Sequence, residues 1–203
     1  MHQYRVEWCE AKAAIIATMP ASFTGNGDDG RTSLLGEGRV RKDDPRVALC
    51  GDLDEASACL GLARSMSRNE DARLVLSTIQ RDLYGVMAEV AALPDSAATF
   101  RSIDSLRVAW LEDVIRRWEA FVRLPEGFIL PGDCVGGAAA AVARTVVRRA
   151  ERGVSALTLS GQLQNPDLLR YLNRLSSLCF VLELLEDREA GVERPTPARP
   201  PVP

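Results

Sequence analysis

Five segments of the chain carry apolar residues at the three- and four-residue spacing of an amphipathic α-helix. We predict helices over residues 45–68, 70–93, 102–122, 137–157 and 166–186. Short links join most of these segments, which favours antiparallel neighbours, so the pattern predicts an all-α, antiparallel five-helix bundle. The predicted apolar faces include Leu49, Leu53, Leu60, Leu74, Leu76, Ile79, Leu83, Leu106, Trp110, Leu111, Trp118, Leu168, Leu172, Leu175 and Leu182.

Residues that favour helix starts indicate where the predicted helices begin, and a change of composition indicates where the bundle domain ends. Asp44-Pro45 and Asn165-Pro166 pair a capping side chain with a first-turn proline, and Ser102 is a further predicted cap. We predict three regions: an N-terminal extension over residues 1–22, the bundle domain over 23–187, and a disordered tail over 188–203. The tail prediction rests on its content of proline, arginine and alanine.

Composition excludes several classes of function. The net charge of −3 and the pI near 5.4 argue against a nucleic-acid-binding protein. No apolar stretch reaches the ~20 residues of a membrane span, and acidic residues and Lys12 interrupt any signal-like core near the start. We therefore expect a cytoplasmic protein with no membrane partner.

Histidine and cysteine usage narrows the chemistry further. The single histidine is His2, so histidine triads and histidine metal sites are excluded. The 5 cysteines are scattered without a CxxC pair, which favours small buried thiols over a zinc site or disulfides. Any catalysis must rely on carboxylates, arginine, lysine, backbone amides or a cofactor.

The segment from Phe128 to Arg152, FILPGDCVGGAAAAVARTVVRRAER, combines a turn, small residues and a row of arginines. Arg144, Arg148 and Arg152 are spaced four apart and share one side of a helix. Because like charges at this spacing repel, the row predicts an anionic ligand or a carboxylate partner. The plain alternative is a solvated basic face. Asp54 lies on a mostly apolar helix and needs a partner, for which the arginine row is the candidate.

Residues 23–38, FTGNGDDGRTSLLGEG, predict a loop because of their many glycines. Its backbone amides and hydroxyl groups suit an anion, and its aspartates suit Mg²⁺ bound to phosphate oxygens. Arg39, Arg41 and Lys42 follow as a positive cluster. The loop lacks a GxxxxGK[ST] motif, and alone it is equally consistent with an ordinary flexible loop.

Four blocks of the chain resemble the PduO-type ATP:cob(I)alamin adenosyltransferases: TGNGDDGRTSLLG, RVRKDDPRVALCGDLDE, FILPGD through ARTVVRRAER, and NPDLLRYLNRLSSLCFVL. The resemblance covers residues 23–187. It implies a five-helix bundle that assembles as a homotrimer with active sites between adjacent subunits. It also implies an enzyme that transfers the 5′-deoxyadenosyl group of ATP, with Mg²⁺, to the cobalt of reduced cobalamin. Its partners would include a flavoprotein-type reductase and an adenosylcobalamin-dependent enzyme.

The same resemblance implies roles for single residues. Arg144 would pair with Asp54, and Phe128 would help displace the lower axial ligand of cobalamin to yield four-coordinate cob(II)alamin. These three residues and Arg148 form the implied catalytic set, and no metal ligands are assigned. The implied nucleotide contacts are Thr24, Asn26, Gly27, Asp28, Gly30, Thr32, Ser33, Lys42, Arg148, Glu151, Arg152 and Asn173.

Several positions depart from the family pattern. Gly25 and Asn26 stand where the loop usually has a lysine and a threonine, and Asp133 replaces the second glycine of a PGG turn. Ala141 stands in place of a common histidine, and Ala56-Ser57 end the usual DELN block. These changes leave open a catalytically weak cobalamin carrier or sensor as an alternative function. A plain helical scaffold is a third possibility.

Overall fold

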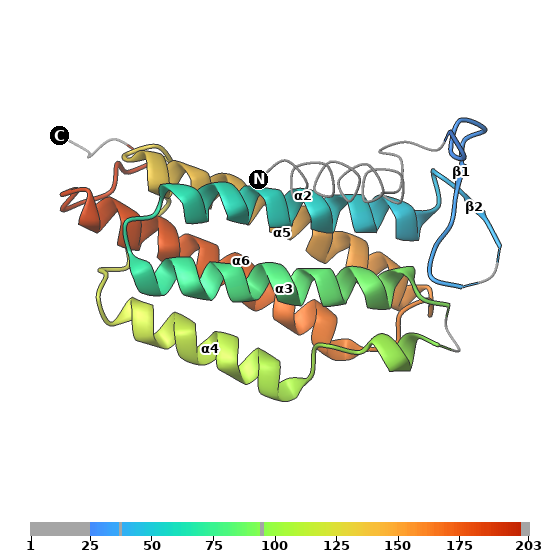
Figure 1. Cartoon of the computed structure of the whole chain (residues 1–203). Helices are drawn as coiled ribbons and strands as arrows, with labels where there is room; N and C mark the ends of the chain where they lie inside the picture. Colours follow the sequence, from blue (N-terminus) through green and yellow to red (C-terminus); the bar gives the residue numbers. More distant parts are fainter. Residues whose placement is uncertain (1–24, 37, 94–95, 200–203) are drawn as a thin grey trace, which may run out of the picture.

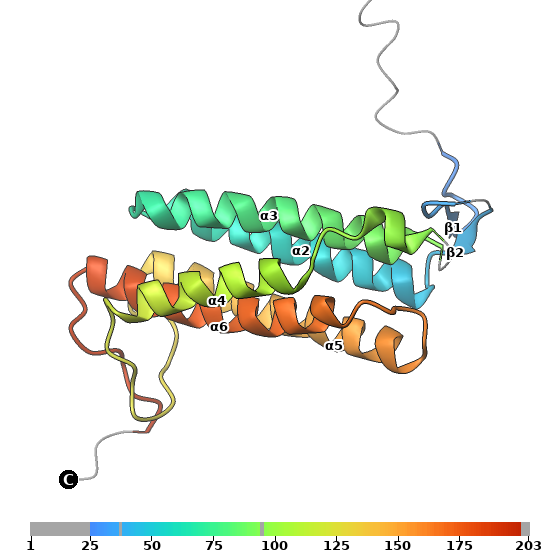
Figure 2. The ribbon, with the colours of Figure 1, turned by 90° about the horizontal axis from the view of Figure 1, so that it is seen from below.

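Five α-helices lie side by side in the computed structural model, which describes residues 25–36, 38–93 and 96–199 (Figure 1). The predicted all-α bundle is confirmed. α5 packs against both α2 and α6, and α4 packs against α6, beside which it lies in Figure 2. The helices are α2 (Pro45–Met66), α3 (Glu70–Ala91), α4 (Ser105–Glu119), α5 (Val135–Leu159) and α6 (Pro166–Glu189), with a short 3₁₀ helix, η1 (Ala97–Phe100), before α4.

Side-chain caps begin the helices close to the predicted positions. The Asp44 carboxylate accepts a hydrogen bond from the Arg46 N–H at 2.9 Å, and Asn165 caps α6 in the same way. The predicted cap at Ser102 is wrong, because Asp104 caps α4 by accepting from the Arg107 N–H at 2.8 Å. Ser102 instead packs against α3 at Gly85, where there is no side chain to exclude it.

The core is formed by leucine, valine and alanine side chains from all five helices. Leu53, Leu76 and Leu172 are fully buried, as their helical spacing predicts. Leu74 and Leu106 were placed on apolar faces, but both lie at the surface of the chain. A helix long and apolar enough to cross a bilayer does not occur in the part of the chain that is described.

The glycine loop differs from the prediction because it contains a small hairpin. β1 (Arg31–Thr32) pairs antiparallel with β2 (Val40–Arg41), with Thr32 opposite Val40. The Leu35 N–H donates to the Ala91 carbonyl at 2.9 Å, which ties the hairpin to the end of α3. Figures 1 and 2 both show the hairpin beyond one end of the bundle.

The predicted tail begins inside α6, which continues to Glu189, and residues 190–199 follow that helix. This stretch returns from α6 and pairs with the loop before α5 through an isolated antiparallel bridge, Ile129 to Pro197. The contact lies at the end of the bundle opposite the hairpin (Figure 2). The pairing joins residues almost seventy positions apart in the chain, which composition alone could not indicate.

Candidate functional site

The first half of α5 packs closely against α6 because it is made of glycine and alanine. A Cβ atom on Gly136 would lie 2.7 Å from Glu186 Oε2, and one on Gly137 would overlap the Asp187 carboxylate. The Cys134 Sγ caps the helix by accepting from the Gly137 N–H at 3.1 Å. This close packing fixes the helix and therefore the direction in which its later arginines project.

A polar pocket of about 390 Å³ lies between the second half of α5 and the start of α6. Arg148, Glu151, Arg152 and Asn173, all implied nucleotide contacts, line it together. The Asn173 amide donates to Glu151 Oε1 at 2.8 Å, and Arg152 Nη1 donates to the Arg148 carbonyl at 3.0 Å. Arg148 is exposed and makes no ion pair within the described part of the chain. The pocket thus has one guanidinium group without an ion pair among the described residues, beside polar side chains that hydrogen bonds hold in place. This arrangement suits an anionic ligand.

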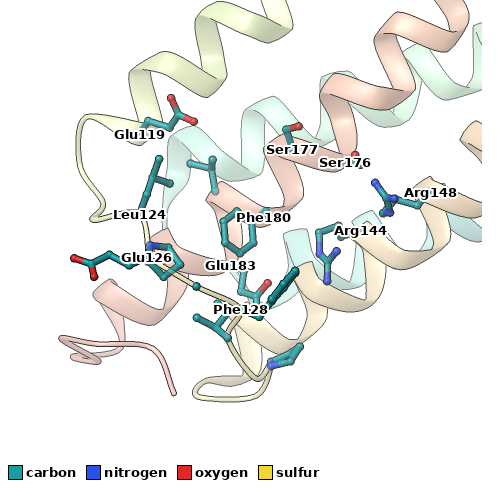
Figure 3. A pocket seen from close by; sticks show the side chains of 15 residues that line it. Glu119, Leu124, Glu126, Phe128, Arg144, Arg148, Ser176, Ser177, Phe180 and Glu183 are labelled. Carbon is teal, nitrogen blue, oxygen red and sulfur yellow. The ribbon is translucent and has the colours of Figure 1, made fainter. Parts of the chain in front are cut away.

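An apolar pocket of about 610 Å³ lies on the other side of Arg148 (Figure 3). Phe128 and Leu124 reach it from the loop between α4 and α5, and Phe180 reaches it from α6. Arg144 and Arg148 project from α5 along one wall (Figure 3). Phe128 is 90% exposed, which is unusual for phenylalanine and leaves the ring available to a ligand.

Glu183 is the buried acid of this apolar pocket. Its side chain belongs to a residue only 1% exposed, and its Oε1 has no hydrogen-bond partner among the described residues. Burial raises the pKa of the Glu183 carboxyl to about 7, although Arg144 opposes the shift. Arg144 Nε is likewise buried without a hydrogen bond there. Two unsatisfied polar groups at one pocket wall are the pattern expected of a ligand site.

Arg144 and Asp54 do not meet within this chain, so their pairing stays a prediction. Arg144 projects into the apolar pocket, whereas Asp54 is exposed on α2. Arg149 makes the contact between α5 and α2 instead: its Nε donates to Asp52 Oδ1 at 2.8 Å, and it also pairs with Glu55. A step of one residue rotates a helical side chain by about 100°, which brings Arg149 rather than Arg148 or Arg144 onto α2.

No described residue of the glycine loop lines either pocket in a single chain. Asp29 is already bound, because Arg39 pairs with it at 2.8 Å and the Arg31 N–H donates to it at 3.0 Å. The Lys42 ammonium lies 2.9 Å from where a Cβ on Gly27 would be, so a side chain there would displace it. The predicted contacts Asn26, Gly27, Asp28, Gly30, Thr32, Ser33 and Lys42 all lie in the hairpin or directly beside it, whereas Thr24 lies outside the described residues.

No three acidic, cysteine or histidine residues gather to hold a metal ion in the described part of the chain. Asp29 is already paired with Arg39, and one carboxylate oxygen of Glu151 already accepts a hydrogen bond from Asn173. Asp29 and Glu151 therefore suit a cation that arrives bound to phosphate oxygens better than one bound by the protein alone. A protein-held magnesium is therefore not assigned.

Sequence reasoning missed four residues that line the apolar pocket: Phe180, Ser176, Ser177 and Glu183. They follow Asn173 at spacings of three, four, seven and ten, so they share its side of α6. That spacing was a usable signal. The helix pattern alone gives Phe180 and Glu183 no role, because it does not show where a loop leaves the neighbouring helix uncovered.

The fold and the two pockets define a helical-bundle protein in which an arginine row lies between a polar pocket and an apolar pocket. The chain belongs to the cobalamin adenosyltransferase family, whose sequence profile matches residues 22–186. The predicted family is thus confirmed over nearly the range expected from the motifs.

Curated relatives agree with this assignment. The chain is 38% identical over 171 residues to the corrinoid adenosyltransferase PduO of Salmonella typhimurium, covering 84% of this chain and 51% of that protein. It is 36% identical over 169 residues to the cobalamin adenosyltransferase of Cupriavidus metallidurans, covering 83% of this chain and 89% of that protein. The chain therefore spans about half the length of the PduO relative and most of the shorter one.

Solved structures of a PduO-type ATP:corrinoid adenosyltransferase from Lactobacillus reuteri share the fold. A phenylalanine-to-alanine variant complexed with cobalamin and ATP superposes with a TM-score of 0.78 at 30% identity, covering 88% of this chain and 99% of that chain. An arginine-to-lysine variant complexed with ATP gives a TM-score of 0.77 at 30% identity, covering 87% of this chain and 99% of that chain.

Proposed function

We propose that this protein transfers the 5′-deoxyadenosyl group of ATP to the cobalt of cob(I)alamin, forming adenosylcobalamin and triphosphate. The cobalt supplies the electron pair of the new bond to carbon, and the bond from that carbon to the triphosphate oxygen breaks. The nucleophile belongs to the corrinoid, so the absence of a usable histidine is no obstacle. The chain has to bind, orient and neutralise its ligands.

The observation that carries the proposal is the position of Arg148 on the wall of both pockets. A triphosphate in the polar pocket and a corrinoid in the apolar pocket would meet at this residue. The guanidinium group would offset the charge that grows on the leaving triphosphate, with Arg152 beside it. The phenylalanine and arginine changed in the Lactobacillus structures are 20 positions apart, as Phe128 and Arg148 are here, which supports the same assignment.

The apolar pocket suits a corrin ring because Phe128, Phe180 and Leu124 offer an apolar surface to it. We assign Phe128 to the face of the ring from which the lower axial ligand must leave, since its exposed ring can occupy that space. Arg144 and Glu183 supply polar atoms for the amide groups at the corrinoid rim. Cytoplasmic location, a flavoprotein-type reductase and an adenosylcobalamin-dependent partner enzyme stay predictions.

We further propose that a homotrimer completes the site. No described residue of the hairpin lines the polar pocket of its own chain, and we infer that a neighbouring copy brings its hairpin with Lys42 to that pocket. The same packing would give exposed Asp54 access to a neighbour's Arg144. Inactive variants should then complement each other: mixing Lys42→Ala with Arg148→Ala subunits should restore roughly a quarter of the sites under random assembly. A mixture that stays inactive would place each site within one subunit.

The direct test supplies ATP, Mg²⁺ and chemically reduced cobalamin and follows the corrinoid absorption spectrum. We expect adenosylcobalamin to form, with Arg116→Ala as a control because Arg116 is exposed on α4 outside both pockets. Failure to form adenosylcobalamin under any reducing condition contradicts the proposal. Tight corrinoid binding without ATP binding, measured by calorimetry, would instead favour the carrier or sensor that the loop departures leave open.

A further inference from the structure

The tail after α6 crosses the segment that carries Phe128. The Ala198 N–H donates to the Phe128 carbonyl at 2.8 Å, and the Leu130 N–H donates to the Thr196 carbonyl at 2.8 Å. These two bonds flank the bridge between Ile129 and Pro197. We call residues 194–198 the strap. The strap runs antiparallel to residues 128–130 of the loop between α4 and α5 and is joined to them by these backbone hydrogen bonds.

Asp133 anchors the strap from the turn before α5. Its Oδ2 accepts from the Thr196 N–H at 2.7 Å, and its Oδ1 accepts from the Thr196 hydroxyl at 2.6 Å. Both donors come from one residue, so the carboxylate fixes the position and the rotation of Thr196 together. The bonds to Thr196 also lower the pKa of the Asp133 carboxyl, which keeps it charged near neutral pH.

Phe128 lies in a loop, so helical hydrogen bonds do not hold its backbone in place. It lies between α4, which ends at Glu119, and α5, which begins at Val135. Its side chain is 90% exposed, so core packing does not fix the ring. Among the described residues, the Phe128 carbonyl accepts a backbone hydrogen bond only from the strap.

Asp133 departs from the family pattern, and this departure creates the anchor of the strap. The strap lies just beyond residues 22–186, which the family profile matches. The glycine that the family pattern has at position 133 could not bind Thr196, since it has no side chain. Asp133 is therefore the residue that attaches the strap to the loop before α5.

We propose that Asp133 and the strap are positioning elements that set Phe128 at the mouth of the apolar pocket. Neither contacts the reacting atoms. The inference rests on the proposed function, because the task of Phe128 is to occupy the lower face of the corrinoid. The consequence is that residues far from the cobalt should control how much four-coordinate cob(II)alamin forms.

The test compares full-length wild type with Asp133→Gly and Ala198→Pro, the latter removing the N–H that binds the Phe128 carbonyl. Both variants should lose most of the four-coordinate cob(II)alamin signal in the presence of ATP, measured by electron paramagnetic resonance. The kcat should fall by roughly tenfold with little change in KM for ATP, less than the ~10²-fold cost of a 1 Å misplacement. Asp133→Asn, which keeps one acceptor oxygen, should restore part of the signal.

Arg199→Pro is the matched control, because the Arg199 N–H makes no hydrogen bond within the described residues. It should behave like wild type. In a Phe128→Ala background, Asp133→Gly should have no further effect, since the strap acts through that ring. Additive losses, or an unchanged signal in Asp133→Gly and Ala198→Pro, would overturn the inference.

Amide hydrogen exchange separates this inference from the proposed function. The Leu130 and Ala198 amides should exchange roughly tenfold faster in Asp133→Gly, because the strap opens more often. If wild type forms no adenosylcobalamin, the proposed function fails, and exchange together with the cob(II)alamin signal decides the inference alone. Unchanged exchange at both amides would show that Asp133 does not hold the strap.

Discussion

The first half of α5, from Val135 to Ala143, is buried against α6 through small side chains, whereas the second half presents guanidinium groups to two pockets. In the first half, carboxylate groups of α6 occupy the space that side chains on Gly136 and Gly137 would fill. In the second half, Arg148 is exposed and without an ion pair in the described chain. Substitutions in the first half of α5 should therefore lower stability, whereas substitutions in the second half should lower activity.

The largest effect should come from Arg148→Ala. We expect kcat to fall by about 10²–10³-fold, the usual cost of removing one donor that stabilises transition-state charge. The free energy of unfolding should change by no more than about 0.5 kcal/mol, because the side chain is exposed. Steady-state kinetics and urea unfolding would check the two halves of this prediction. A loss of stability well above this value would show that the arginine row has a structural role, and it would contradict the difference between the two halves of α5.

Gly137→Ala should show the reverse behaviour. The added Cβ would overlap the Asp187 carboxylate and lie 3.2 Å from the Glu183 carbonyl, so we expect a loss of about 1–3 kcal/mol in the free energy of unfolding. Gly51→Ala in α2 is the matched control, because no atom lies within 4 Å of the new Cβ. It should stabilise the protein by roughly 0.4–1 kcal/mol. Equal responses in urea unfolding would contradict the close packing of α5 on α6.

Glu183→Gln tests the buried acid between the two regions. The carboxyl pKa of about 7 lies above its ordinary 4.5, so the folded protein binds this proton more tightly than the unfolded chain does. Glu183 therefore lowers stability progressively as pH rises from roughly 4.5 to 7. The variant should unfold at a higher Tm than wild type at pH 8 and near the same Tm at pH 5.

Calorimetry at the two pH values would measure this difference. Glu126→Gln is the control, since Glu126 lines the same pocket with a side chain 96% exposed. A Tm difference between Glu183→Gln and wild type that is the same at both pH values would refute the assignment.

The smallest effect should come from Arg149→Ala. This change removes the ion pairs with Asp52 and Glu55 that join α5 to α2. Both pairs are partly exposed, so the expected loss is about 0.2–1 kcal/mol, and it should shrink in 1 M salt. The transferase rate should stay near that of wild type, which would separate Arg149 from Arg148 although the two are adjacent in sequence. A large loss of rate would mean that Arg149 also reaches the ligands.

Helix positions could be predicted because the apolar periodicity of each segment matches the face it buries. The pocket residues Glu151 and Asn173 were also accessible to sequence reasoning, through the family motifs that contain them. The pairing of Arg144 was not, since an arginine row shows a common side of a helix but not which neighbour that side meets. The strap was hidden for a related reason: it depends on one carboxylate and one threonine, 63 positions apart.

The shared position of Arg148 means that the two substrates would be thermodynamically linked. A polyanion against this guanidinium group lowers the positive potential felt in the adjoining apolar chamber, and a bulky ring there restricts the rotamers available to the same side chain. Each ligand would therefore alter the affinity for the other by an equal factor. The half-saturating concentration of one substrate should therefore depend on how much of the other is bound, without any movement of the helices.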